Sequence, residues 1–186
     1  MSFAEQQVSD GLGKVLASAR LFSDFSQPWI VSGGWAIDLF LGHTTRKHKD
    51  VDISVFRQDQ LAVQSFLHGW QLYTAHDGKL ALWPEGEYLE LPYMGIWAWP
   101  PGAEAGKVES PPDMEVLLDE RDATHWRYRR DQRITRPLER VCLWGGPLGD
   151  IPCLAPEVAL LYKSKEPRTE DSHDFEVAWP EMDAER

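Results

Sequence analysis

The sequence predicts a mixed α/β domain in which a β-sheet is flanked by helices, with a small helical extension at the C-terminus. Three observations lead to this fold class. Apolar residues recur at helical spacing near both ends of the chain, short segments between residues 70 and 130 alternate as strands do, and a strand–Gly-Gly–helix junction at residues 29–42 precedes another strand. We expect residues 1–150 to form the core and residues 151–186 to form the extension.

Length and composition suit a single medium-sized domain. The chain has 186 residues, of which 42% are hydrophobic, so it can bury a substantial core. No apolar run approaches the roughly 20 residues that span a bilayer, and the N-terminus lacks a signal-peptide pattern. We therefore expect a cytoplasmic protein without a membrane partner. The two cysteines, Cys142 and Cys153, form no CxxC pair and are expected to be reduced structural thiols.

The net charge of −11 bears on the partners of the protein. An acidic surface repels nucleic acid and attracts cations, so the charge disfavours a nucleic-acid substrate and favours a cationic small molecule. Acidity also aids solubility in general.

The first half of the chain alternates helices and strands. Its first helix is indicated by apolar residues at helical spacing, and glycine or Gln27-Pro28 ends each helix. In chain order we expect a helix over residues 4–25, a buried strand over 29–33, a helix over 35–42, a polar loop over 43–49, a strand over 50–56 and a helix over 58–69.

The second half is richer in strands until the last 32 residues. His76-Asp77-Gly78 is typical of a hairpin turn, and the Pro- and Gly-rich segment 100–113 indicates an exposed loop. Pro156 suits the first turn of a helix. We expect strands over 70–76, 79–84, 87–92, 93–99, 114–120, 125–130 and 140–144, a loop over 145–152, and helices over 155–165 and 170–179. The strand at 125–130 would pair with that at 114–120.

Two aspartates open the strand at 50–56. Residues two apart on a strand point to one face, so Asp50 and Asp52 project together while Val51, Ile53 and Val55 face the core. Two like charges held side by side are unfavourable unless a cation neutralises them, and hard carboxylate oxygens suit Mg²⁺. The pattern predicts a magnesium site at Asp50 and Asp52.

A phosphate site is predicted at the junction before them. At Gly33 and Gly34 the backbone N–H groups can approach a ligand closely, the helix N-terminus adds partial positive charge, and Ser32 can donate a hydrogen bond. A phosphate-binding turn beside two metal-binding carboxylates indicates metal-assisted phosphoryl or nucleotidyl transfer.

These residues carry a resemblance to a known family. The segment GGWAIDLFLGHTTRKHKDVDI, residues 33–53, closely resembles the opening of antibiotic nucleotidyltransferases, above all the aminoglycoside 2″-adenylyltransferase type, within the polymerase β-like superfamily. The shared signature is an apolar residue, Gly-Gly or Gly-Ser, a short helix and an Asp-x-Asp strand. The resemblance is strong over residues 29–56 and weak through the middle of the chain.

The resemblance implies a nucleotidyltransferase-type sheet and roles for individual residues. Ser32, Gly33 and Gly34 would hold ATP, Asp50 and Asp52 would bind Mg²⁺, and a substrate hydroxyl would attack the α-phosphate as pyrophosphate leaves. Arg46 and His48 would contact phosphate or brace the loop before the strand, of which we favour the brace.

The superfamily adds a third carboxylate from a neighbouring strand, as metal ligand or base. On the strand at 114–120, Glu115 and Asp119 share one face and Glu120 lies on the other. We favour Glu120, then Asp119, then Glu115, with Glu90 as a rival on another segment.

Cations in the last third of the chain offer phosphate contacts. Six arginines crowd residues 127–140; we expect most of them to pair with acids and Arg129 or Arg130 to clamp phosphate. Lys163 lies on a helix that resembles a Lys…Arg…Asp-x-x-Asp arrangement of related nucleotidyltransferase-like proteins, including abortive-infection toxins. The resemblance implies that Lys163 contacts phosphate, although a solvated lysine is equally compatible, while Arg168, Asp171 and Asp174 brace the helices.

The function that we expect is Mg²⁺-dependent transfer of AMP from ATP to a hydroxyl of a small, aminoglycoside-like acceptor, with antibiotic resistance as the corresponding role. The aromatic segment 93–101 would wall the acceptor site or belong to the core. The acceptor surface would either be smaller than in the related enzymes or be completed by a second subunit, as in a homodimer. The alternatives are a toxin-like transferase acting on protein or tRNA, and a catalytically degenerate nucleotide-binding module. The sequence does not determine the acceptor or the nucleotide preference.

Overall fold

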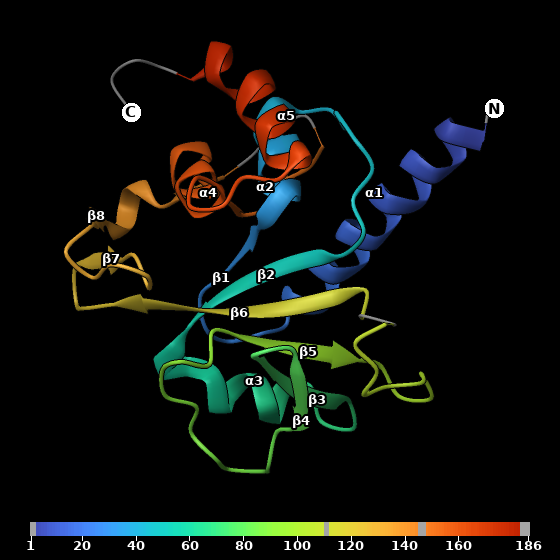
Figure 1. The fold of residues 1–186 in the computed structure, drawn as a ribbon, viewed down its shortest axis with the longest axis vertical. Coiled ribbons are helices and arrows are strands. Elements are labelled where there is room, and N and C mark those ends of the chain that lie inside the picture. Colours follow the sequence, from blue (N-terminus) through green and yellow to red (C-terminus); the bar gives the residue numbers. More distant parts are fainter. Residues whose placement is uncertain (1–2, 110–111, 145–147, 183–186) are drawn as a thin grey trace.

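The computed structural model describes residues 3–109, 112–144 and 148–182 (Figure 1). Parts of the expected loops at 100–113 and 145–152 lie outside these ranges. The helices are α1 (Phe3–Phe22), α2 (Gly33–Leu41), α3 (Gln60–Phe66), α4 (Pro156–Lys163) and α5 (Thr169–Ala178), with short 3₁₀ turns at Arg57–Asp59, Leu138–Arg140 and Trp179–Glu181. The strands are β1 (Trp29–Ser32), β2 (Val51–Phe56), β3 (Gln71–His76), β4 (Lys79–Leu82), β5 (Gly95–Trp99), β6 (Met114–Arg121), β7 (His125–Arg127), β8 (Thr135–Pro137), β9 (Cys142–Leu143) and β10 (Cys153–Leu154).

Within the described residues the strands join in one mixed sheet. Its order is β4-β3-β5-β6-β2-β1-β10-β9, and β7 extends from β6 to pair with β8. Strands β2 and β6 run parallel, as do β1 and β10, whereas the other pairs are antiparallel. The prediction of a mixed α/β fold with a sheet flanked by helices is confirmed.

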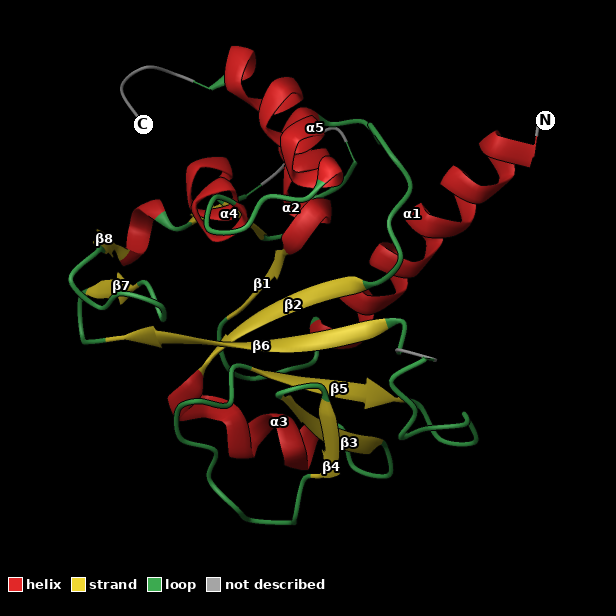
Figure 2. Cartoon of the chain, in the orientation of Figure 1, coloured by secondary structure: helices red, strands yellow, loops and turns green. Residues whose placement is uncertain are grey.

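Helices cover the sheet from several sides (Figures 1 and 2). Helices α2, α4 and α5 pack against one another beside β1 and β10, and α3 lies by the β3–β5 part of the sheet. Although β10 falls inside the predicted extension, it pairs with β1 and so belongs to the main sheet. The division of the chain at residue 150 stays a prediction.

The core follows the strand periodicity. On β2 the side chains of Val51, Ile53 and Val55 are buried, and on β6 those of Met114, Val116 and Leu118 are buried, as alternation requires. The opposite faces of both strands therefore carry the polar side chains that line the site described below.

One predicted strand is absent. Residues 87–92 form no strand, because side chains take the place of a neighbouring strand. The backbone N–H of Leu89 donates to Gln60 at 2.6 Å, and the Leu89 carbonyl accepts from Arg57 at 3.0 Å and Gln60 at 3.1 Å. Glu90 is consequently exposed on this loop.

The segment after β6 also differs from expectation. Strand β7 pairs with β6 as predicted but ends at Arg127, after which the chain turns through residues 128–134 and forms the unpredicted strand β8. Short strands such as β8 and β10 lack the four or more residues from which alternation can be recognised.

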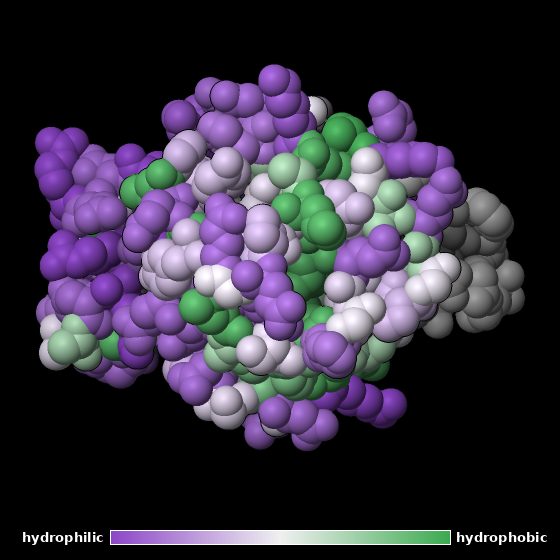
Figure 3. All heavy atoms as spheres, turned by 90° about the horizontal axis from the view of Figure 1, so that it is seen from below, coloured by the Kyte–Doolittle hydropathy of each residue, from purple (hydrophilic) through white to green (hydrophobic). Residues whose placement is uncertain are grey.

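Hydrophobic residues form a band on the underside of the molecule (Figure 3). Exposed apolar side chains on α3, β4 and the loop after β4 include Leu61, Leu82, Tyr88 and Leu91. Among the described residues no helix is both long and apolar enough to cross a membrane.

Arg57 links the loop at 87–92 to β6. Its side chain is 5% exposed and donates to Glu120 at 2.5 Å and to the Tyr93 carbonyl at 2.8 Å. We expect Arg57→Ala to lower the free energy of unfolding by about 3–5 kcal/mol, because Glu120 is left without its partner. Urea denaturation measures this loss. Arg133→Ala, which removes an arginine that is 90% exposed, is the control and should leave the unfolding midpoint unchanged; equal midpoints for both variants would contradict the role of Arg57.

Candidate active site

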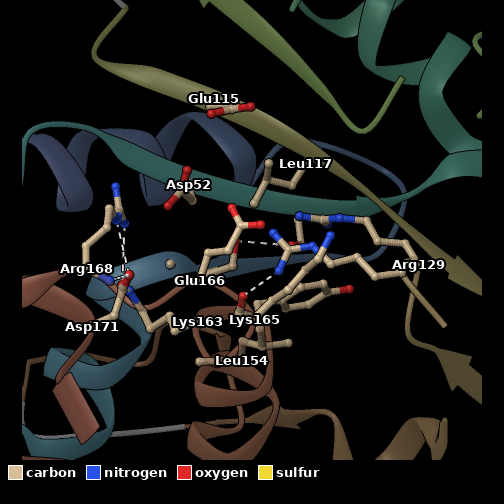
Figure 4. Close-up of a pocket in the computed structure, with 16 residues that line it drawn as sticks. Asp52, Glu115, Leu117, Arg129, Leu154, Lys163, Lys165, Glu166, Arg168 and Asp171 are labelled. Carbon is tan, nitrogen blue, oxygen red and sulfur yellow. Dashed lines mark hydrogen bonds and ion pairs between the residues drawn. The ribbon is translucent and has the colours of Figure 1, made fainter. Parts of the chain in front are cut away.

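Three polar residues stand side by side across three adjacent strands. Ser32 on β1 lies opposite Asp52 on β2, and Asp52 lies opposite Glu115 on β6. Residues in register on neighbouring strands project from the same face of a sheet. In the close-up, Asp52 and Glu115 come from adjacent strands that border one pocket (Figure 4).

Gly33 brings the start of α2 against Asp52. Its φ of +62° is a left-handed conformation that favours glycine, and a Cβ atom at this position would overlap the Asp52 carboxylate. At Gly34 a Cβ would collide with Arg46 and His48. The two glycines therefore let the first turn of α2 approach both the carboxylate and the loop before β2.

The pocket has a volume of about 400 Å³. The polar face of the sheet forms one wall, and α4 with the segment that follows it forms the other (Figure 4). Around Asp52 and Glu115 it is lined by Ser32, Gly33, Ser54, Leu117, Arg129, Arg130, Leu154, Ala159, Tyr162, Lys163, Lys165, Glu166, Arg168 and Asp171.

The two carboxylates lack a directly bound cation. No ion pair joins Asp52 or Glu115 to a lysine or arginine in the described part of the chain. Burial, with the nearby charge of Asp50, raises the pKa of Asp52 to about 6. Burial, with the charges of Asp52 and Asp50, raises the pKa of Glu115 to about 8. Burial and like charge thus disfavour the ionised forms of both carboxylates, and the cations of the site act on them only from a distance.

Asp50 immediately precedes β2 and faces a smaller hollow beside the pocket, which Asp52, Lys163 and Arg168 also line. Across the described residues, no three histidine, cysteine, aspartate or glutamate side chains converge tightly enough to hold a metal ion by themselves. Mg²⁺ is commonly held by one or two carboxylates together with water and substrate phosphates. Asp50 and Asp52, unneutralised oxygen donors at a helix N-terminus, fit that kind of site.

Of the four candidates for a third carboxylate, the structure brings Glu115 beside Asp52. Glu120, which we favoured, projects from the opposite face of β6 and pairs with Arg57. Asp119 is buried farther along β6, where it accepts from Arg129 at 2.8 Å and from the Tyr162 hydroxyl at 2.8 Å. Glu90 is on the exposed loop after β4.

Lys163 belongs to a buried ion-pair network at the end of α4. Its ammonium contacts Asp171 at 2.8 Å and Asp174 at 2.9 Å. Asp174 also accepts two hydrogen bonds from Arg46, at 2.6 and 2.7 Å, and Asp171 accepts from Arg168 at 3.1 Å. These contacts tie α5 to the loop before β2, as a brace does.

His48 holds the same loop to α2. The Nε2 atom of His48 lies 2.6 Å from the Asp38 carboxylate, which also accepts a hydrogen bond from the Thr45 hydroxyl at 2.7 Å. The imidazole ring of His48 packs on the Trp35 ring, with 4.3 Å between the two centroids. Asp38 is fully buried. The loop is therefore anchored on both sides before Asp50.

Most of the arginine cluster is paired with acids, as we expected. Arg127 pairs with Asp122, Arg129 with Asp119, Arg133 with Asp131 and Arg136 with Glu157. Within the described residues, two cations of the pocket have no ion pair with a carboxylate. They are Arg130, which donates to the Tyr162 carbonyl at 2.7 Å, and Lys165 on the segment after α4.

Sequence reasoning missed Gly95 and Lys165. The Glu115 carboxylate occupies the space beside Gly95 on β5, because a Cβ atom at Gly95 would overlap this carboxylate. Only the pairing of β5 with β6 reveals this contact, because 20 residues separate the two positions. Lys165 was passed over because the helix was expected to continue to that residue, whereas α4 ends at Lys163.

Part of the chain is similar to a family of known proteins. Residues 14–80 match a family model described as aminoglycoside-2″-adenylyltransferase. The chain has no significant match among curated proteins. The family match includes β1, α2, the loop before β2 and β2, and so covers Gly33, Asp50 and Asp52.

Solved structures with the same fold come from antibiotic-modifying enzymes. The lincomycin-bound lincosamide antibiotic adenylyltransferase LnuA is 17% identical, with a TM-score of 0.59 over 88% of this chain and 93% of that chain. ANT(2″)-Ia in complex with adenylyl-2″-tobramycin is 17% identical, with a TM-score of 0.57 over 97% of this chain and 91% of that chain. The solution structure of ANT(2″)-Ia, an antibiotic-resistance factor, is 14% identical, with a TM-score of 0.56 over 96% of this chain and 87% of that chain.

At these identities the solved structures show the fold, which is that of nucleotidyltransferases. The predicted resemblance to antibiotic nucleotidyltransferases is confirmed, and the family match together with the fold indicates a nucleotidyltransferase enzyme.

The close approach of Gly33 to Asp52 is testable by a double-mutant cycle. We expect Gly33→Ala to reduce the free energy of unfolding by more than Gly78→Ala, because Gly78 has a similar φ of +69° but open space around it. Left-handed backbone alone costs about 1–2 kcal/mol per residue. In an Asp52→Ala background, Gly33→Ala should lose about 1 kcal/mol less, which urea denaturation can measure. Strict additivity would contradict the contact.

Proposed function

We propose that this chain transfers a nucleoside monophosphate, in the form of AMP from ATP, to a hydroxyl of a small molecule in a Mg²⁺-dependent reaction that releases pyrophosphate. The single observation that carries the proposal is a pair of carboxylates on adjacent strands, Asp52 and Glu115, that have no ion-pair partner among the described residues, with Asp52 against the glycine turn that starts α2.

The pocket suits a nucleotide donor. The backbone N–H groups at Gly33 and Gly34 and the positive end of α2 favour phosphate. Ser32 adds a hydroxyl, and Arg130 and Lys165 add positive charge that no carboxylate compensates within the described residues. Lys163 is compensated by two aspartates, so we assign it mainly to positioning, with Arg46 as the brace of the loop before Asp50.

Asp50 and Asp52 would hold the magnesium. Bound there, Mg²⁺ would supply charge stabilisation at the phosphates. The chain's own residues would then orient the donor, with Gly33 and Ser32 toward the phosphates, while Leu117, Leu154 and Ala159 supply the apolar part of the lining.

Glu115 is the base of this proposal. The acceptor hydroxyl oxygen forms a bond to the α-phosphorus, the bond from the α-phosphorus to the bridging oxygen breaks, and pyrophosphate carries away that electron pair. The hydroxyl proton goes to Glu115. A carboxylate whose pKa is raised to about 8 suits proton transfer near neutral pH.

The acceptor that we propose is a small cationic molecule of the aminoglycoside kind. The family description and the net charge of −11 support it. The reaction would occur in the cytoplasm, where ATP is available. The alternative is a catalytically degenerate module, which the lack of a carboxylate next to Asp52 would favour. Glu115 lies next to Asp52, so this alternative is not favoured.

Turnover of labelled donor tests the function. Purified protein with Mg²⁺ and radiolabelled ATP should label an aminoglycoside or a lincosamide. Asp52→Asn and Glu115→Gln should each lower kcat/KM by about 10²–10³-fold. Glu90→Gln, on the exposed loop, is the charge-matched control and should not change it.

Label on a macromolecule of a cell extract, rather than on a drug, would favour the toxin-like alternative. Loss of turnover in Glu120→Gln with normal turnover in Glu115→Gln would contradict the assignment of the base.

The phosphate contacts of Arg130 and Lys165 are testable by binding. We expect Arg130→Gln and Lys165→Gln each to weaken binding of a non-hydrolysable ATP analogue about tenfold, because a charge-assisted contact is lost. Binding of AMP should change much less. Arg133→Gln, on the exposed side of the same segment, is the control for net charge. Isothermal titration that shows equal losses for AMP and the ATP analogue would place these residues at the base or sugar instead.

A further inference from the structure

We propose that Gly95 and Trp97 of β5 form a cradle that holds the Glu115 carboxylate against β5, which makes both of them positioning residues for the base. This inference rests on the proposed function, because it concerns the residue that takes the proton there.

Gly95 provides the space. A Cβ atom at Gly95 would overlap one carboxylate oxygen of Glu115 and lie 3.3 Å from its Cδ. The φ of Gly95 is not in the left-handed region, so backbone conformation does not require glycine here. The close approach of Glu115 does require it.

Trp97 provides a hydrogen-bond donor. It lies directly opposite Glu115 in the antiparallel pair of β5 and β6, so both side chains project from one face of the sheet. The side chain of Trp97, whose indole N–H can act only as a donor, lowers the pKa of Glu115 against the larger effects of burial and of Asp52 and Asp50, which raise it. This interaction joins the carboxylate to β5 rather than to a cation.

The Trp97 ring is itself held in place. Its centroid lies 5.8 Å from that of Trp99, whose ring packs edge-on against Tyr73 at 5.5 Å. Trp99 is buried, whereas Trp97 is only partly buried and faces the site. A ring fixed in this way can orient the glutamate, whose side chain is otherwise flexible.

The cradle also holds Glu115 in place against electrostatic repulsion by Asp50 and Asp52. Asp50 and Asp52 both act electrostatically on Glu115, so a free glutamate would turn away from them towards solvent. With Gly95 beneath it and Trp97 opposite on β5, the Glu115 carboxylate is held in place on the face of the sheet that carries Asp52. Glu115 therefore remains available to the acceptor.

Steady-state kinetics test the cradle. We expect Trp97→Phe, which keeps an aromatic ring but replaces the indole and removes its N–H, to lower kcat about 10–100-fold, the usual effect of losing a hydrogen bond behind a reacting group. The KM for the acceptor and the Kd for an ATP analogue should change less than about twofold. Gly95→Ala should act in the same direction. Trp83→Phe is the matched control, because it removes an indole hydrogen bond to the Glu87 carbonyl away from the site, and kcat should stay unchanged.

A second measurement is independent of activity, metal and acceptor. In a ¹⁵N-correlated NMR spectrum the indole signal of Trp97, assigned from its loss in Trp97→Phe, should move on Glu115→Ala and stay in place on Glu90→Ala. An unmoved Trp97 signal in Glu115→Ala, or an unchanged kcat in Trp97→Phe, would overturn the cradle. If the wild-type chain labels no acceptor, the proposed function fails while the NMR result still decides the contact.

Discussion

Two carboxylates on neighbouring parallel strands, Asp52 and Glu115, face one pocket, and no lysine or arginine of the described residues is paired with either. Burial of like charges in this way is unfavourable by itself. Glycine makes it sterically feasible at two positions, since Gly33 yields space to Asp52 and Gly95 yields space to Glu115. The arrangement is most easily understood as preparation for a cation and a phosphate-bearing ligand.

The C-terminal helices complete the site from the other side. Asp171 and Asp174 bind the cations that flank the pocket, so Lys163, Arg46 and Arg168 pair with these aspartates and not with Asp52. Because Asp174 is fully buried and contacts both Arg46 and Lys163, it joins α4 and α5 to the loop before β2. The helical pair thereby serves the geometry of the strand that carries Asp52.

The sequence was sufficient for the local features of the site. Alternation placed Asp52 opposite to Val51 and Ile53, and the glycine pair marked the start of α2, because these properties depend on residues close together in the chain. The third carboxylate could not be chosen in this way. Its position depends on the register between the parallel strands β2 and β6, which no tight turn determines, and the register sets Glu115 rather than Glu120 beside Asp52. Likewise, the strand predicted at 87–92 failed because Arg57 and Gln60, distant in sequence, satisfy its backbone.

The free energy of unfolding in metal-free buffer at neutral pH tests most directly whether Asp52 is an unneutralised charge kept for a ligand. The account predicts that Asp52→Asn stabilises the folded chain by on the order of 1–3 kcal/mol, since it removes a buried charge without a partner. Asp38→Asn, at a buried aspartate that Thr45 and His48 do satisfy, should destabilise it. Destabilisation by Asp52→Asn to the same extent as by Asp38→Asn would contradict the account.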